Sequence, residues 1–247
     1  MKAQLALLAI LALPLPAGAE TVRLATEGAF PPFNFVDDNG EVAGLERELG
    51  DLLCQRAQLT CGWSVTDWAS LLSGLQGGQS DAVLAAVTIT PKRQAEFDFT
   101  QPYLPPPASV FVAPTGKTDI SSGLVAVLTG TVQADYLASE GRQTLATATA
   151  DQAIAAVAGG KAVAALTDRI FALGAIERAE GNLALAGTPL SLGPGIGIAL
   201  RRDEPELKAS LDQAIGTMKC DGSLDALILK WLGPDADVFG EAGKTQC

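Results

Sequence analysis

The chain has 247 residues, a formal net charge of −11 and no histidine. The acidic balance disfavours nucleic acid and anionic membranes as partners, and it is typical of a surface kept soluble by carboxylates. The lack of histidine removes the commonest general base and metal ligand. The sequence also lacks GxSxG, P-loop and CxxC motifs, so we expect no catalytic residues, no metal site and no cofactor.

Residues 1–19 have the pattern of a cleaved secretory signal peptide. Lys2 provides a positive start, residues 5–13 are apolar, and residues 17–19 form an A-x-A-like cleavage site. The apolar run is too short to span a bilayer, and no cysteine for a lipid anchor lies near the cleavage site. Removing this segment leaves 228 residues with a formal charge of −12, enough for two lobes.

The first half of the chain alternates predicted strands and helices. Strands are expected at residues 22–26, 62–66 and 81–87, and helices begin near Leu45 and Trp68. Residues 27–33 leave the first strand as a proline-rich loop, and residues 37–40 form a hairpin-type turn. After the third strand, Thr90 and Pro91 are suited to the N-cap and first position of a helix.

The second half repeats the alternation after the proline-rich residues 102–107. It predicts strands at 109–113, 124–128, 145–149, 162–166 and 196–200, and helices at 131–139, 154–158, 169–179, 206–218 and 223–232. The Gly/Pro-rich residues 187–195 indicate a return to the first series. We therefore predict an α/β protein of two lobes, each a mixed sheet flanked by helices, joined by two crossover strands. The lobes are expected at 20–108 plus 195–247 and at 109–194, with a ligand cleft between them.

Four cysteines, Cys54, Cys61, Cys220 and Cys247, suit disulfides in an oxidising compartment, and spacing alone leaves their pairing open. A local bridge between Cys54 and Cys61 would leave the other two to tie the C-terminal tail to the last helices.

Arg93 lies in the first turn of the helix that follows Thr90, where backbone N–H groups and a guanidinium would favour a bound anion. The alternative is a solvated pair of cations, with Lys92 facing Glu96. Thr131 could hold an oxyanion and Asp168 an ammonium, but either residue could instead be a plain helix N-cap.

Three further side chains have both a binding and a structural interpretation. Glu27 could pair with a ligand cation or be a solvated loop carboxylate. Phe30 and Trp68 could sandwich an aliphatic stem with a cation at its end, or belong to the core.

Seven segments together resemble the periplasmic amino-acid-binding proteins of ABC importers, solute-binding protein family 3. They are EGAFPPFNF at 27–35, residues 44–49, Asp67-Trp68, AAVTITPKR at 85–93, FDFTQPY at 97–103, Gly130-Thr131 and residues 221–232. Within that family the chain is most similar to the lysine/arginine/ornithine/histidine and opine receptors, including a cysteine pair in the place of Cys54 and Cys61.

The resemblance implies a role for each matched residue. Arg93 would hold the ligand α-carboxylate with the N–H groups of Thr88 and Thr131, and Asp168 would take the α-ammonium with the Thr88 hydroxyl and the Ala86 carbonyl. Phe30 and Trp68 would flank the ligand side chain, Glu27 would meet its distal cation, and Gln133 can line the second-lobe face. The sequence departs from the basic-amino-acid pattern at Ala85-Ala86, where those receptors often carry hydroxyls, and at Phe30, where they often carry tyrosine.

The resemblance thus predicts a monomeric periplasmic receptor without enzymatic activity. It would capture a free cationic amino acid (arginine, lysine, ornithine, histidine or an opine) and deliver it to inner-membrane ABC permease subunits. The alternatives are a dehydratase-like periplasmic enzyme on the same scaffold, a receptor for a polar non-cationic amino acid, or the ligand-binding part of a signalling system.

Overall fold

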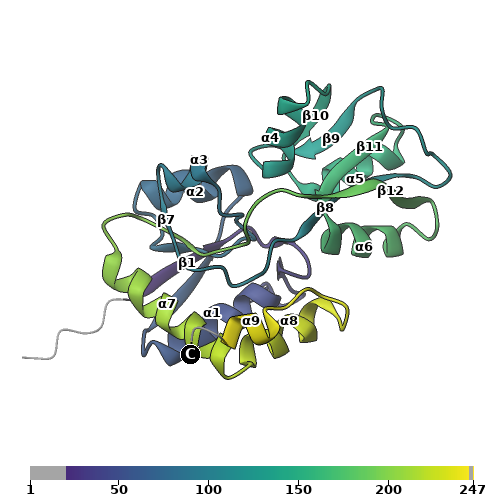
Figure 1. The fold of residues 1–247 in the computed structure, drawn as a ribbon. Helices are drawn as coiled ribbons and strands as arrows, with labels where there is room; N and C mark the ends of the chain where they lie inside the picture. Colours follow the sequence, from purple (N-terminus) through teal and green to yellow (C-terminus); the bar gives the residue numbers. More distant parts are fainter. Residues whose placement is uncertain (1–20, 245–246) are drawn as a thin grey trace, which may run out of the picture.

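The computed structural model describes residues 21–244 and 247, which form two lobes (Figure 1). The predicted signal peptide lies outside the described residues. Among the helices of the described residues, none combines the length and the apolar character that a membrane span needs.

The first lobe is built on a mixed sheet with the strand order β5-β1-β6-β13-β7. β1 is parallel to β5 and β6, whereas β13 is antiparallel to β6 and β7. The strands are β1 (Val22–Thr26), β5 (Cys61–Val65), β6 (Ala82–Val83), β7 (Asp98–Phe99) and β13 (Ala199–Leu200). A small antiparallel sheet follows β1 and consists of β2 (Ala29–Phe30), β3 (Asn34–Val36) and β4 (Val42–Ala43).

Helices cover both faces of the first sheet. They are α1 (Leu45–Arg56), α2 (Trp68–Gln76), α3 (Pro91–Gln94), α7 (Pro205–Cys220), α8 (Ser223–Leu232) and α9 (Gly240–Lys244). Successive residues of a strand point to opposite faces, so Leu24 packs with α1, α7 and α8 while Ala25 packs with α2.

The second lobe is built on a sheet with the strand order β10-β9-β11-β8-β12. Its strands are β8 (Ala108–Pro114), β9 (Val125–Leu128), β10 (Thr144–Thr147), β11 (Ala164–Asp168) and β12 (Leu183–Ser191), and its helices are α4 (Val132–Ser139), α5 (Ala150–Ala158) and α6 (Arg169–Arg178). α5 and α6 pack on one face of the sheet and α4 on the other. Both lobes therefore have the predicted arrangement of a mixed sheet flanked by helices (Figure 1).

Two segments connect the lobes and pair with each other. Residues 100–107 lead from β7 to β8, and residues 192–198 lead from β12 back to β13. Tyr103 donates its N–H to the Ile196 carbonyl (2.9 Å), and Ile196 donates to the Leu104 carbonyl (3.1 Å). Gly195 has φ +144°, and a Cβ there would lie 2.8 Å from the Leu104 oxygen, so this close approach requires glycine. The lobe boundaries given above remain predictions.

The strand expected at 81–87 is shorter than predicted, because β6 comprises only Ala82–Val83. Ala86 has φ +50° and donates its N–H to the Glu46 carboxylate (2.6 Å) instead of a neighbouring strand. A residue in the left-handed region cannot continue an extended strand. The segment therefore stays buried but leaves the sheet.

The structure contains short elements that the sequence pattern did not predict. β2 to β4 are two or three residues long, and β2 lies in the segment expected to be a proline-rich loop. The hairpin-type turn predicted at 37–40 is confirmed, because it connects the antiparallel strands β3 and β4. Residues 183–191 form the edge strand β12, where an edge position tolerates Pro189. α5 begins four residues before the predicted helix, since Thr149 caps it by accepting from the Gln152 N–H (3.1 Å).

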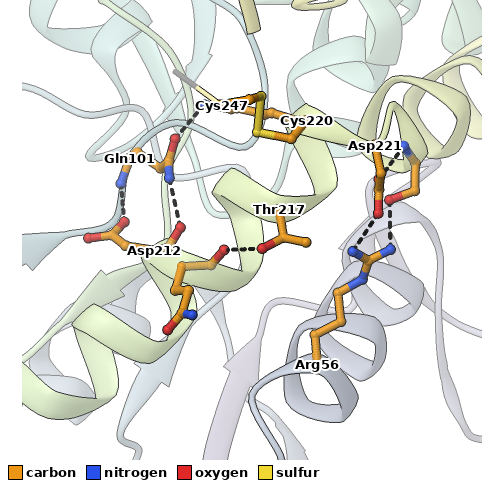
Figure 2. The surroundings of a disulfide bond; sticks show 10 residues. Arg56, Gln101, Asp212, Thr217, Cys220, Asp221 and Cys247 are labelled. Carbon is orange, nitrogen blue, oxygen red and sulfur yellow. Dashed lines mark hydrogen bonds and ion pairs between the residues drawn. A yellow bond between two sulfur atoms is a disulfide. The ribbon is translucent and has the colours of Figure 1, made fainter. Parts of the chain in front are cut away.

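Both expected disulfides are present. Cys54–Cys61 joins the end of α1 to the start of β5, and Cys220–Cys247 joins the end of α7 to the C-terminus (Figure 2). Beside the second bridge, Arg56 pairs with Asp221 at 2.7 Å and connects α1 to the end of α7.

Removing the C-terminal disulfide should cost more stability than removing the local one. The bridges close 27 and 7 residues of chain, respectively. Loop-closure entropy then gives losses of about 3 to 4 kcal/mol for Cys220→Ser with Cys247→Ser and about 2 to 3 kcal/mol for Cys54→Ser with Cys61→Ser. Urea unfolding of both double variants measures the difference, and a larger loss for the 54–61 pair would contradict it.

Candidate functional site

One cavity between the lobes is lined by all eight residues that the sequence analysis named as ligand-binding. It comprises about 430 Å³ of empty space, including the part that opens to solvent. The predicted residues in its wall are Glu27, Phe30, Trp68, Ala86, Thr88, Arg93, Thr131 and Asp168; Ala85, Leu128, Val132, Gln133, Leu166 and Thr167 complete it.

These residues meet because they follow the carboxyl ends of strands in both sheets. Glu27 follows β1, Ala86 follows β6, Thr131 follows β9, and Asp168 is the last residue of β11. In open α/β sheets, ligands bind outside the carboxyl ends of the strands. The topology therefore brings residues from distant parts of the sequence to one cleft.

Arg93 is held at the boundary of the two lobes. Its Nη1 donates to the Thr88 carbonyl (2.7 Å) and its Nη2 to the Gly130 carbonyl of the second lobe (3.1 Å). A guanidinium has five N–H donors, so three remain for a bound anion. Burial lowers the pKa of Arg93, although the charges of Asp135 and Asp168 oppose the shift, and the group stays protonated. α3 is a single turn, so the guanidinium rather than a helix dipole is the source of positive charge.

Thr88 presents backbone groups beside Arg93. It lies opposite Ile196 in an antiparallel β-bridge. The hydrogen bonds of this bridge are made by the residues on either side of Thr88 and Ile196. Ile89 donates its N–H to the Gly195 carbonyl (2.9 Å), and Gly197 donates its N–H to the Val87 carbonyl (3.2 Å). The N–H and C=O of a residue in such a non-hydrogen-bonded pair point away from the partner strand. The Thr88 carbonyl accordingly meets Arg93, and the Thr88 N–H is directed to the same side.

Thr131 is an N-cap, as one of its two interpretations predicted. Its Oγ1 accepts from the Ala134 N–H (3.2 Å) and donates to the Leu128 carbonyl (2.8 Å), so the hydroxyl proton is already used. The hydroxyl therefore has no proton left for an oxyanion. The backbone N–H of Thr131, the other donor predicted for this role, remains a prediction.

Asp168 occupies the N-cap position of α6 but makes no side-chain cap hydrogen bond. Its carboxylate instead accepts from Gln133 Nε2 (3.2 Å), and the same amide reaches the Ser109 hydroxyl (3.0 Å). Burial raises the pKa of Asp168 to about 6, and the Gln133 hydrogen bond and the positive charge of Arg93 only partly oppose this rise. The carboxylate is thus aimed into the cavity rather than at the helix.

Glu27 is a buried carboxylate without a cation. It is 6% exposed, and no hydrogen bond or ion pair to its side chain occurs among the described residues. Burial is the main reason that its pKa is raised to about 7, and the negative charges of Glu46, Asp151 and Asp67 add to the shift. This region of the cavity therefore has an uncompensated negative potential whenever Glu27 is ionised.

The aromatic residues connect the lobes. Phe30 stacks on Phe33 (ring centroids 5.3 Å apart) and on Phe171 of the second lobe (4.7 Å). Trp68 donates its indole N–H to the Thr129 carbonyl (2.9 Å), and the Arg93 guanidinium lies 5.7 Å from its ring centroid. Phe171 was not predicted as part of the site, because the residue spacing in α6 carries no signal for a contact with the other lobe.

A second missed feature is the ion pair between Lys92 and Asp135, which crosses the cleft at 3.1 Å. Lys92 is exposed as expected, but its partner lies on α4 rather than at Glu96. Together with the hydrogen bonds of Trp68 and Arg93 to the second lobe, this pair gives direct contacts between the lobes across the cleft. Among the described residues, no group of His, Cys, Asp or Glu side chains forms a metal site.

Replacing the Glu27 carboxylate should stabilise the ligand-free protein in a pH-dependent way. The pKa of Glu27 is about 7 in the folded state against 4.5 for the free side chain, so folding stability is lost as pH rises from about 4.5 to 7. Glu27→Gln should therefore raise the free energy of unfolding by up to about 3 kcal/mol at pH 8, and by far less at pH 5. Denaturant unfolding at both pH values measures this. An equal effect at both, or the same gain from the exposed Glu41→Gln, would contradict it.

Comparisons with known proteins agree with this architecture. The family model for bacterial extracellular solute-binding proteins, family 3, matches residues 22–234. A lysine/arginine/ornithine-binding periplasmic protein of Escherichia coli is 31% identical over 90% of each chain. An L-cystine-binding protein of the same species is 30% identical over 87% of this chain and 84% of its own.

A solved structure is also similar to this chain in sequence and fold. A periplasmic His/Glu/Gln/Arg/opine family-binding protein from Silicibacter pomeroyi, in complex with lysine, is 46% identical, with a TM-score of 0.86 over 88% of this chain and all of its own. The family predicted from the sequence motifs is therefore confirmed: the chain belongs to family 3 of the bacterial extracellular solute-binding proteins.

Proposed function

We propose that this protein is a periplasmic receptor that closes on one free amino acid with a cationic side chain and delivers it to an ABC permease. The observation that carries the choice of ligand is Glu27, a buried carboxylate whose surroundings contribute further negative charge and no cation. Burying an ionised carboxylate without a partner is unfavourable. A guanidinium or ammonium at the end of a ligand side chain would supply the missing charge.

The rest of the cavity suits the backbone of an α-amino acid. Arg93 has donors left for an α-carboxylate, and the N–H groups of Thr88 and Thr131 can add to them. Asp168 would accept from the α-ammonium, together with the Thr88 hydroxyl and the Ala86 carbonyl. Phe30 and Trp68 would then border the aliphatic stem.

The relatives support an amino acid as ligand but leave its side chain open, since one of them is named for lysine, arginine and ornithine and another for cystine. The negative surroundings of Glu27 favour the cationic class. A neutral side chain would leave Glu27 either protonated or unpaired.

Periplasmic location, the permease partner and the monomeric state follow from the same proposal. Two of the relatives named above, the lysine/arginine/ornithine-binding protein and the His/Glu/Gln/Arg/opine family-binding protein, are periplasmic binding proteins, and this one would act by binding and release without turnover. Closure brings the lobes together through direct contacts such as Lys92–Asp135, so the closed form differs in surface from an open one and can be recognised by a transporter.

The choice between arginine and citrulline tests the proposed ligand class. The two molecules have almost the same shape, but citrulline carries a neutral urea group. Titration calorimetry of ligand-free protein, unfolded, washed and refolded with its disulfides intact, should give tighter binding of L-arginine than of L-citrulline by on the order of 10- to 100-fold. Glu27→Gln should reduce this ratio, whereas the matched surface variant Glu41→Gln should preserve it.

Equal affinities for the two ligands in the native protein would contradict a ligand with a cationic side chain, but would still agree with an α-amino acid as ligand. Failure of arginine, lysine, glutamine, aspartate and cystine to bind at micromolar concentration would overturn the receptor itself. Consumption of arginine on prolonged incubation, followed by NMR, would instead favour the alternative of a periplasmic enzyme on the same scaffold.

A further inference from the structure

Beneath the binding cavity lies a second buried carboxylate, Glu46, which is not among the residues of the cavity wall. It is the second residue of α1 and is 0% exposed. Its Oε1 accepts from the Ala86 N–H (2.6 Å) and from the Tyr103 hydroxyl, and its Oε2 accepts from Asn34 Nδ2 (2.6 Å). One side chain thus connects three separate segments of the first lobe.

Two of these connections end at the cavity wall. Ala86 lines the cavity with φ +50°, a conformation that is unfavourable for a residue with a Cβ. Gly28, next to Glu27, has φ +67° and donates its N–H to Asn34 Oδ1 (2.8 Å). Because this bond fixes the Asn34 amide, its NH₂ group faces Glu46. The Glu46 network therefore holds both left-handed turns, one beside Glu27 and one at Ala86.

The three partners match an ionised carboxylate. Burial raises the pKa of Glu46, and the three hydrogen bonds only partly oppose this rise. Burial and the negative charge of Glu46 raise the pKa of Tyr103 well above 10, so the phenol keeps its proton and donates it. An ionised Glu46 also adds its charge to the negative surroundings of Glu27.

We propose that Glu46 is a positioning residue of the binding site, which holds the Ala86 carbonyl and the Glu27 loop in place and adds negative charge where the ligand cation binds. This inference rests on the proposed function for the identity of the ligand, but the positioning of Ala86 is a property of the ligand-free protein as well.

The substitution Glu46→Gln should disturb both turns although it preserves size. In either orientation of the new amide, its NH₂ group faces a donor, either Asn34 Nδ2 or the Ala86 N–H. Turning Asn34 over would satisfy Glu46→Gln but would leave the Gly28 N–H without its acceptor. No arrangement keeps all the hydrogen bonds.

The test compares L-arginine and L-citrulline binding by titration calorimetry in the native protein, Glu46→Gln and Glu48→Gln. Glu48 lies on the same helix, pairs with Lys230 and is outside the cavity wall, so its variant controls for lost charge on α1. We expect Glu46→Gln to weaken arginine binding by on the order of tenfold or more, to weaken citrulline binding less, and Glu48→Gln to change neither.

The pH profile of arginine binding separates positioning from a loss of stability. The charged groups that act on Glu27 are Glu46 on α1, Asp67 before α2 and Asp151 on α5. Arginine affinity should rise with pH as Glu27 ionises, and removing the negative charge of Glu46 lowers the pKa of Glu27. The midpoint of the pH dependence of arginine affinity should therefore move to lower pH in Glu46→Gln. It should stay in place in Glu46→Asp, which keeps the negative charge. Glu46→Asp also takes the place of Glu46→Gln in the test if that variant does not fold.

The substitution Ala86→Gly supplies a rescue, since glycine adopts the left-handed conformation without strain. The factor by which Glu46→Gln weakens arginine binding should be smaller in an Ala86→Gly background. In ligand-free protein, hydrogen exchange at the Ala86 amide should be faster in Glu46→Gln than in the native protein.

Unchanged arginine affinity, pH midpoint and Ala86 exchange in Glu46→Gln would overturn the positioning role while leaving the receptor function intact. If the native protein binds no amino acid, the proposed function fails, and Ala86 exchange alone still decides the role of Glu46: faster exchange in the variant supports it, and unchanged exchange contradicts it.

Discussion

The structure depends on two carboxylates of the cavity wall, the buried Glu27 and the partly buried Asp168, that the fold leaves without a full counter-charge. Their pKa values are raised to about 7 and about 6, mainly because they are removed from water. Such groups weaken the protein at neutral pH and are retained where a ligand completes them. The charges that line the cavity are therefore not balanced within the protein. An amino acid with a cationic side chain carries two positive charges, which would pair with the two carboxylates, and one negative charge, which would pair with Arg93.

The fold makes this arrangement possible by assembling the cavity from strand ends. Glu27 and Ala86 follow strands of the first sheet, while Thr131 and Asp168 follow or end strands of the second. Each lobe thus supplies one carboxylate, and Arg93 reaches a carbonyl on both sides. A ligand that contacts both lobes binds the closed state more tightly than an open one. Binding therefore shifts the population of the protein toward the closed conformation.

Apolar periodicity predicted the two-lobed α/β fold with its long helices and central strands. The resemblance to a known family predicted the residues that line the cavity, since the local pattern around Arg93 left an anion site and a solvated pair of cations both open. Cysteine spacing left the disulfide pairing open, and the structure pairs Cys54 with Cys61 and Cys220 with Cys247. The pattern could not reveal that Ala86 leaves the sheet, because its left-handed φ depends on an acceptor 40 residues away in Glu46. For the same reason, the contacts of Phe171 with Phe30 and of Asp135 with Lys92 became visible only in three dimensions.

The central claim is that the positive charges of the ligand complete the carboxylates of the cavity, and proton release on binding measures it directly. At pH 6, Glu27 is largely protonated and Asp168 about half protonated in the ligand-free protein. A bound guanidinium and α-ammonium lower both pKa values, so arginine binding should release about one proton or more. Calorimetric titration at pH 6 in two buffers of different ionisation enthalpy gives this number. A net release would agree with the account, and no proton change or a net uptake would contradict it.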